Sequence, residues 1–99
     1  MPIFRFYSDE MNLSQAKKYM IRMAEAFNVA EESLKEGDIG DALYSYGDIS
    51  TYRSNAVDYC LTIKDNEMKD KCRDELRRVT GDTLYKLHDK LVDVCSAKR

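Results

Sequence analysis

The first two thirds of the chain carry apolar residues at alternating steps of three and four. The first run is Leu13, Ala16, Met20, Met23, Phe27, Ala30 and Leu34. The second run is Ile39, Ala42, Tyr46, Ile49, Arg53, Ala56, Cys60 and Ile63, with Arg53 as its one charged member. This spacing gathers side chains on one narrow face of an α-helix. Two such helices in succession predict a hairpin with a coiled-coil-like seam.

Capping residues and glycines place the ends of these two helices. Asn12 can cap the first helix, with Gln15 three positions later completing a capping box, and Gly37 ends it. The first helix is therefore expected over residues 12–36. The second is expected over residues 39–64, with Asp38 or Asp41 as its cap.

A third and longer helix is expected over residues 66–97, capped by Asp65 or Asn66. Its predicted buried face is Cys72, Leu76, Val79, Thr83, Leu87, Leu91 and Val94. A break at residues 80–82, which include Gly81, is an open alternative that would divide this helix in two. Because the connecting turns are short, the prediction is a single all-α domain over residues 1–99, an antiparallel up-down-up three-helix bundle.

Composition narrows the class of protein. The 99 residues carry a formal net charge of −2, which gives no overall bias towards nucleic acid or anionic membranes. Three cysteines without C-x-x-C spacing argue against a disulfide framework and favour a reducing, cytoplasmic location. Cys60 and Cys72 are expected as core residues, with a bridge between them under oxidation as the alternative. Neither a signal peptide nor a membrane span is expected.

Aromatic residues outside the seams are the candidate protein interface. Residues 1–11 are expected to form an extended arm, which either packs over the end of the bundle or docks on another chain. Tyr52 and Tyr59 lie on the flank of the second helix, where they pack against the third helix or meet a partner. An apolar overhang at the end of the third helix is a candidate dimer contact. The predicted interface residues are Phe4, Phe6, Tyr7, Tyr52, Tyr59 and Val94.

Arg53 stands in an apolar seam, where a charge is costly unless it is paired or reaches water. The alternatives are an arginine with its head in solvent, an ion pair with an acidic residue of the third helix, and a contact to an anionic ligand. A basic row on the third helix is the candidate nucleic-acid contact. It consists of Lys69, Arg73, Arg77 and Arg78.

No pattern in the chain predicts catalysis, a cofactor or a metal. His88 is the one histidine, and neither Asp89 nor Asp93 lies one full turn away on its face. A di-iron helical bundle needs Glu-x-x-His pairs, whereas Tyr85 stands three residues before His88. No glycine-rich phosphate-binding loop is present.

The segment Gly37-Asp38-Ile39-Gly40-Asp41-Ala42-Leu43-Tyr44-Ser45-Tyr46 resembles the turn and second-helix start of a tetratricopeptide-type hairpin. The resemblance implies a helix-turn-helix over these ten residues. The family's following alanine and proline signals and its 34-residue repeat are absent, so peptide binding by a solenoid is not implied.

These observations favour a non-enzymatic protein-interaction module, such as a small regulator, inhibitor, chaperone or adaptor that occupies the surface of another protein. A homodimer is a further expectation. The alternative is a nucleic-acid-associated factor that uses the basic row of the third helix.

Overall fold

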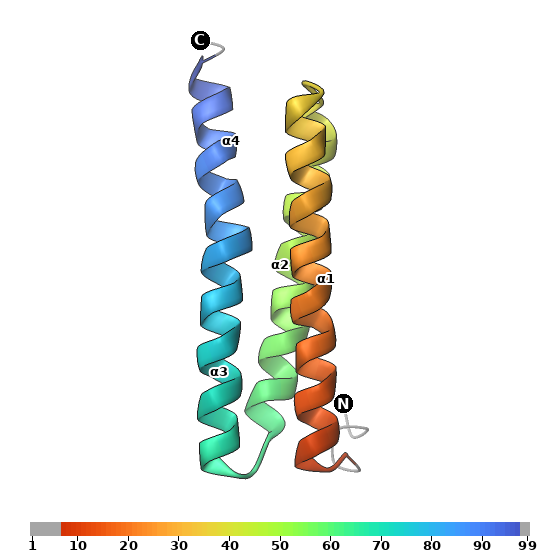
Figure 1. Ribbon diagram of the computed structural model, residues 1–99, viewed down its shortest axis with the longest axis vertical. Helices are drawn as coiled ribbons and strands as arrows, with labels where there is room; N and C mark the ends of the chain where they lie inside the picture. The colour runs from red at the N-terminus through yellow and green to blue at the C-terminus, as the bar shows by residue number, and fades with distance from the viewer. Residues whose placement is uncertain (1–6, 98–99) are drawn as a thin grey trace.

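The computed structural model describes residues 7–97, which form three antiparallel helical rods (Figure 1). The first is α1 (Asp9–Lys35) and the second is α2 (Ile39–Thr62). The third is built from α3 (Asn66–Thr80), a π-helical turn η2 (Gly81–Tyr85) and α4 (Lys86–Ala97). The described residues contain no strand, and the predicted all-α up-down-up bundle is confirmed. The fold is elongated, with extents of 50 × 22 × 17 Å.

Helix α1 begins earlier than expected. Ser8 is its cap, since the Ser8 hydroxyl accepts a hydrogen bond from the Met11 backbone N–H at 3.1 Å. The predicted start at Asn12 is therefore wrong, and residues 9–11 of the expected arm are helical. Asn12 is instead fully buried in the second turn. Residues 1–6 of the arm lie outside the described part of the chain.

The other caps are among those expected. The Asp38 carboxylate accepts from the Asp41 N–H at 3.0 Å, and the Asp65 carboxylate accepts from the Met68 N–H at 2.8 Å. Gly37 has a φ of +80°, a left-handed conformation that only glycine adopts without strain, and it forms the turn between α1 and α2. Helix α2 ends at Thr62, two residues before the expected end.

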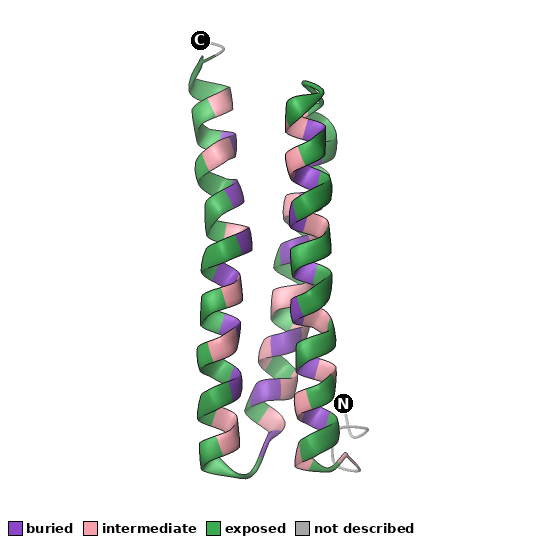
Figure 2. Ribbon diagram, viewed as in Figure 1, coloured by how far each residue is buried: buried purple, intermediate pink, exposed green. Residues whose placement is uncertain are grey.

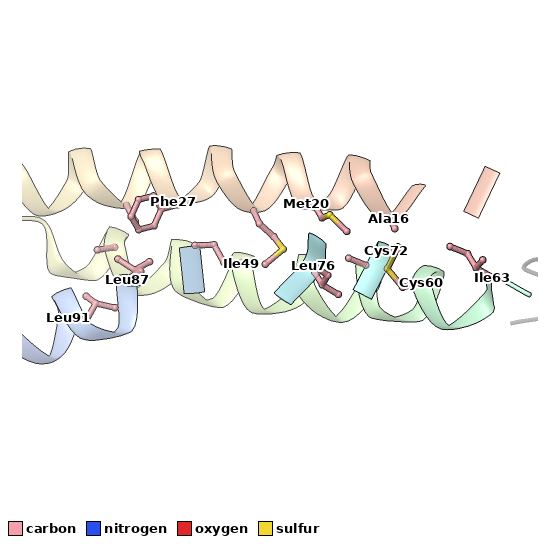
Figure 3. Packing of buried hydrophobic residues seen from close by; sticks show 14 residues of the cluster. Ala16, Met20, Phe27, Ile49, Cys60, Ile63, Cys72, Leu76, Leu87 and Leu91 are labelled. Carbon is pink, nitrogen blue, oxygen red and sulfur yellow. A yellow bond between two sulfur atoms is a disulfide. The ribbon is translucent and has the colours of Figure 1, made fainter. Parts of the chain in front are cut away.

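The core is a stripe along the inner face of each rod (Figure 2). In α1 the buried apolar residues are Ala16, Met20, Met23, Phe27 and Ala30. In α2 they are Ala42, Ile49, Ala56 and Cys60. The inner positions of the first predicted seam are thus confirmed, whereas Leu13 and Leu34 at its ends are only half-buried. In the second seam Tyr46 and Arg53 are also only half-buried, and Ser45 is buried instead. Figure 3 shows these side chains meeting residues of the third rod, including Leu76 and Leu87.

The third rod is one helix with a wide turn, so the alternative of a break at residues 80–82 is wrong. Its buried residues are Cys72, Leu76, Thr80, Thr83, Leu87 and Leu91. Their steps of four, four, three, four and four average roughly 3.8 residues per turn, more than the 3.6 of an α-helix. The π turn η2 absorbs the extra residue, so both halves of the rod face the hairpin. Thr80 is buried in place of the expected Val79, which is half-buried.

Two interactions hold the helices together at the end of the bundle that contains the α2–α3 turn. Cys60 and Cys72 form a disulfide between α2 and α3, with their Cα atoms 5.7 Å apart (Figure 3). The expectation of no disulfide is therefore wrong, and the alternative that the sequence left open is the one observed. Cys95 is free and exposed. The second interaction is made by Asp9, whose carboxylate accepts hydrogen bonds from the backbone N–H groups of Lys64 and Asp65 at 2.9 and 3.0 Å.

Across residues 7–97, no helix combines the length and the apolar character that crossing a membrane requires.

Candidate protein-binding groove

A groove of about 510 Å³ runs between the second half of α2 and the third rod. We call it the arginine groove. It is lined by Arg53, Val57, Cys60, Leu61, Arg73, Leu76, Arg77, Thr80 and Tyr85. The residues therefore come from α2, from α3 and from the π turn η2, and the Cys60–Cys72 disulfide joins α2 to α3 beside them.

The charged side chains that line this groove are all positive. Three of its lining residues are arginines, and none is an aspartate or a glutamate. Arg77 forms an exposed ion pair with Asp74 of its own helix at 3.4 Å. Within residues 7–97, Arg53 and Arg73 form no ion pair. Exposed pairs are weak because water screens them, so the groove retains a positive potential.

Arg53 is the least satisfied of the three. Its side chain is half-buried, and its Nε is buried with no hydrogen-bond partner. The sequence left open an ion pair with an acidic residue of the third helix, and that alternative is wrong because the third rod presents Arg73 and Arg77 here. A half-buried guanidinium without a carboxylate is costly to the fold. An incoming anion would lower that cost.

The walls of the groove are apolar. Cys60 and Leu76 are buried at its base, and Val57 is half-buried beside them. Leu61 and Tyr85, from opposite sides, are 54% and 57% exposed. Tyrosine and arginine side chains are enriched at the energetic centres of protein interfaces, and the exposed leucine adds apolar surface that a partner can bury.

The π turn determines which residue stands in this wall. In a regular α-helix the row Arg73, Arg77 would continue through residues 80–81 to Leu84. The extra residue in η2 moves Tyr85 into that row and leaves Leu84 half-buried against the core. No pattern in the sequence shows this shift, which is why Tyr85 was missing from the predicted interface.

The basic row predicted from the sequence is divided by the structure. Arg73 and Arg77 line the arginine groove, whereas Lys69 does not. Arg78 points elsewhere and is paired with Glu75 at 2.6 Å and with Asp82 at 3.3 Å. The Arg78 hydrogen bond lowers the pKa of Glu75, as expected for a carboxylate held charged by its partner.

The predicted tyrosines form a ladder on the α1–α2 hairpin. Tyr59 lies between Tyr7 and Tyr19, with ring centroids 6.3 and 5.9 Å apart, and Tyr52 lies 6.2 Å from Tyr19. Tyr52 and Tyr59 therefore pack against α1, which neither alternative had foreseen. Burial, together with the neighbouring Tyr19 and Tyr7, raises the pKa of Tyr59.

The remaining predicted interface residues are spread over the molecule. Val94 is half-buried and lines a shallow groove with Leu34, so the C-terminal overhang begins later than expected. Phe4 and Phe6 lie outside the described residues.

His88 lies 3.6 Å from Asp89, with its ring 6.2 Å from that of Tyr46. Residues 7–97 contain no cluster of histidine, cysteine or acidic side chains suited to a metal ion.

Comparison of the chain with protein-family models, with curated protein sequences and with solved structures finds no match.

Proposed function

We propose that this chain is a non-catalytic protein-interaction module whose working surface is the arginine groove. The ligand would be a protein segment in which carboxylates flank an apolar side chain. The observation that carries the proposal is the combination in one groove of three arginines, no carboxylate, and the exposed side chains of Leu61 and Tyr85. Guanidinium groups bind carboxylates through paired hydrogen bonds, and the apolar wall adds burial.

Three features favour a protein ligand over a nucleic acid. Arg78, one of the four predicted nucleic-acid contacts, lies outside the groove and is paired with two acidic residues. The chain as a whole carries a charge of −2, which opposes a polyphosphate. A nucleic acid is also usually bound by a basic surface that follows its backbone, whereas these arginines converge on one short groove.

The test is binding of a fluorescent, glutamate-rich peptide with one central leucine, measured by anisotropy. The variant Arg73→Glu should weaken binding by roughly tenfold or more, because a like charge replaces a partner. The matched control is Arg22→Glu, which makes the same charge change at an exposed position of α1 outside the groove. It should alter the affinity less than about twofold.

Two outcomes would contradict the proposal. An equal loss of affinity in both variants would mean that the peptide senses only the overall charge. Tighter binding of a single-stranded oligonucleotide than of the peptide, with the same dependence on Arg73, would favour the nucleic-acid alternative.

A further inference from the structure

A second surface of the same chain carries the acidic side chains that the arginine groove lacks. On the first turns of α2, Asp41, Tyr44 and Asp48 occupy one face, because they are three and four residues apart. We call this surface the aspartate knob. Tyr44 is 75% exposed, the highest value among the large apolar and aromatic residues described. Asp41 and Asp48 form no ion pair within residues 7–97.

The knob carries surplus negative charge just as the groove carries surplus positive charge. Asp38, the cap of α2, lies directly beside Asp41. Its hydrogen bond and negative charge raise the pKa of Asp41, which is the effect of two carboxylates sharing a site. A cation brought to this place would relieve that repulsion. Each surface thus lacks the charge that the other displays.

The two surfaces cannot meet within one molecule. Tyr44 and Val57 are separated by about 20 Å along α2, at 1.5 Å per residue. At 100° per residue, the knob and the groove also lie on nearly opposite sides of that helix. The knob of one molecule can therefore reach only the groove of another.

We propose that the aspartate knob of one copy docks in the arginine groove of the next. Tyr44 enters between Leu61 and Tyr85, and Asp41 and Asp48 pair with the groove arginines. This inference rests on the proposed function, since it names the occupant of the same groove. The contact joins two different surfaces, so it repeats head to tail and gives a chain or ring of copies.

The experiment is light scattering of the full chain over a range of concentrations, in a Cys95→Ala background that excludes intermolecular disulfides through Cys95. The average mass should rise with concentration and fall as salt is added. Two variants each remove one surface: Arg73→Glu with Arg77→Glu for the groove, and Tyr44→Ala with Asp48→Arg for the knob. Each alone should remain monomeric, with an unchanged circular dichroism spectrum.

Mixing these two variants is the decisive step. One intact groove and one intact knob remain in the mixture, so a 1:1 dimer should form that does not grow further. A mixture that stays monomeric while the parent chain associates would place self-association elsewhere and overturn the inference. A parent chain that is monomeric throughout, yet binds the leucine-containing acidic peptide through Arg73, would overturn the inference and leave the proposed function standing.

Discussion

Asp9 links the start of α1 to the turn between α2 and α3. Its carboxylate accepts the backbone N–H groups of both Lys64 and Asp65, and these bonds are the main reason that its pKa lies below the ordinary value of 3.8. A carboxylate with a lowered pKa in the folded state stabilises the fold above its unfolded pKa. That contribution is lost as the pH falls through the folded-state pKa.

Replacing Asp9 by Asn should therefore lower the free energy of unfolding at neutral pH. The difference in free energy of unfolding between the two proteins should shrink as the pH falls below about 4, because a protonated Asp9 is uncharged, as asparagine is. Urea unfolding from neutral pH down to about pH 2.5 measures this difference.

Glu10→Gln is the matched control for Asp9→Asn. It removes one negative charge from the same first helical turn, at an exposed residue. A comparable loss of stability in this control would mean that the effect comes from the helix dipole and not from the bonds to the α2–α3 turn.

Asp9 stabilises the fold, whereas Arg53 is expected to destabilise the fold and to contribute to the proposed binding site. Its charge is half-buried beside Arg73 and Arg77 and has no carboxylate partner. Arg53→Met should raise the free energy of unfolding by about 1 kcal/mol, because an unsatisfied polar group and a like-charge repulsion are removed. The same change should weaken binding of the acidic peptide.

Urea unfolding and peptide anisotropy on the Arg53→Met variant measure both effects, with Arg22→Met as an exposed control that should change neither. A less stable Arg53→Met protein would mean that the charge is satisfied in the fold. An anionic ligand would then not be needed to offset the cost of the half-buried Arg53.

Residue-level prediction from sequence worked where the signal was local. Asp38 and Asp65 were each one of two residues expected as a cap, and both are the observed caps, since an aspartate side chain accepts a hydrogen bond within its own first helical turn. Asn12 was mistaken for the first cap because its spacing to Gln15 imitates a capping box. Ser8, followed by Asp9 and Glu10, was the true signal.

At the scale of helices, the disulfide fixes α3 to α2 at the end of the bundle where the connecting turn is short. The bonded residues Cys60 and Cys72 are 12 positions apart. Reduction should lower the free energy of unfolding by about 3 kcal/mol, the loss expected when a loop of this length is opened.

Urea unfolding with and without a reducing agent tests the disulfide without creating a cavity, since the thiols stay in place. The Cys95→Ala background ensures that no other cysteine contributes. An unchanged unfolding midpoint after complete reduction would show that helix packing alone holds the third rod.

The helices could be predicted from sequence, and the arginine groove could not. Helical periodicity reports which face of each helix is apolar, and this placed Ala16, Phe27 and Ile49 in the core. The groove depends on which flank of α2 meets which flank of the third rod. The sequence predicts Arg73 and Arg77 together in one basic row and singles out Arg53 separately. The contact that unites all three lies between distant segments, and the π turn that adds Tyr85 has no sequence pattern.

At the scale of the whole molecule, charge is segregated although the total is small. The net charge is −2, yet three arginines gather in one groove while Asp38, Asp41 and Asp48 gather near the other end of α2. This arrangement on an elongated bundle gives opposite signs to two separated surfaces. We expect such a molecule to attract acidic partners, including further copies of itself, at low salt.

The most direct test of the groove is an NMR titration of the isotope-labelled knob variant, Tyr44→Ala with Asp48→Arg, by the unlabelled groove variant, Arg73→Glu with Arg77→Glu. We expect chemical-shift changes concentrated in residues 53–61 and 73–85 of the labelled protein, the segments that carry the groove residues. Changes centred on the tyrosine ladder of Tyr7, Tyr19, Tyr52 and Tyr59, or on the end of α4, would contradict it.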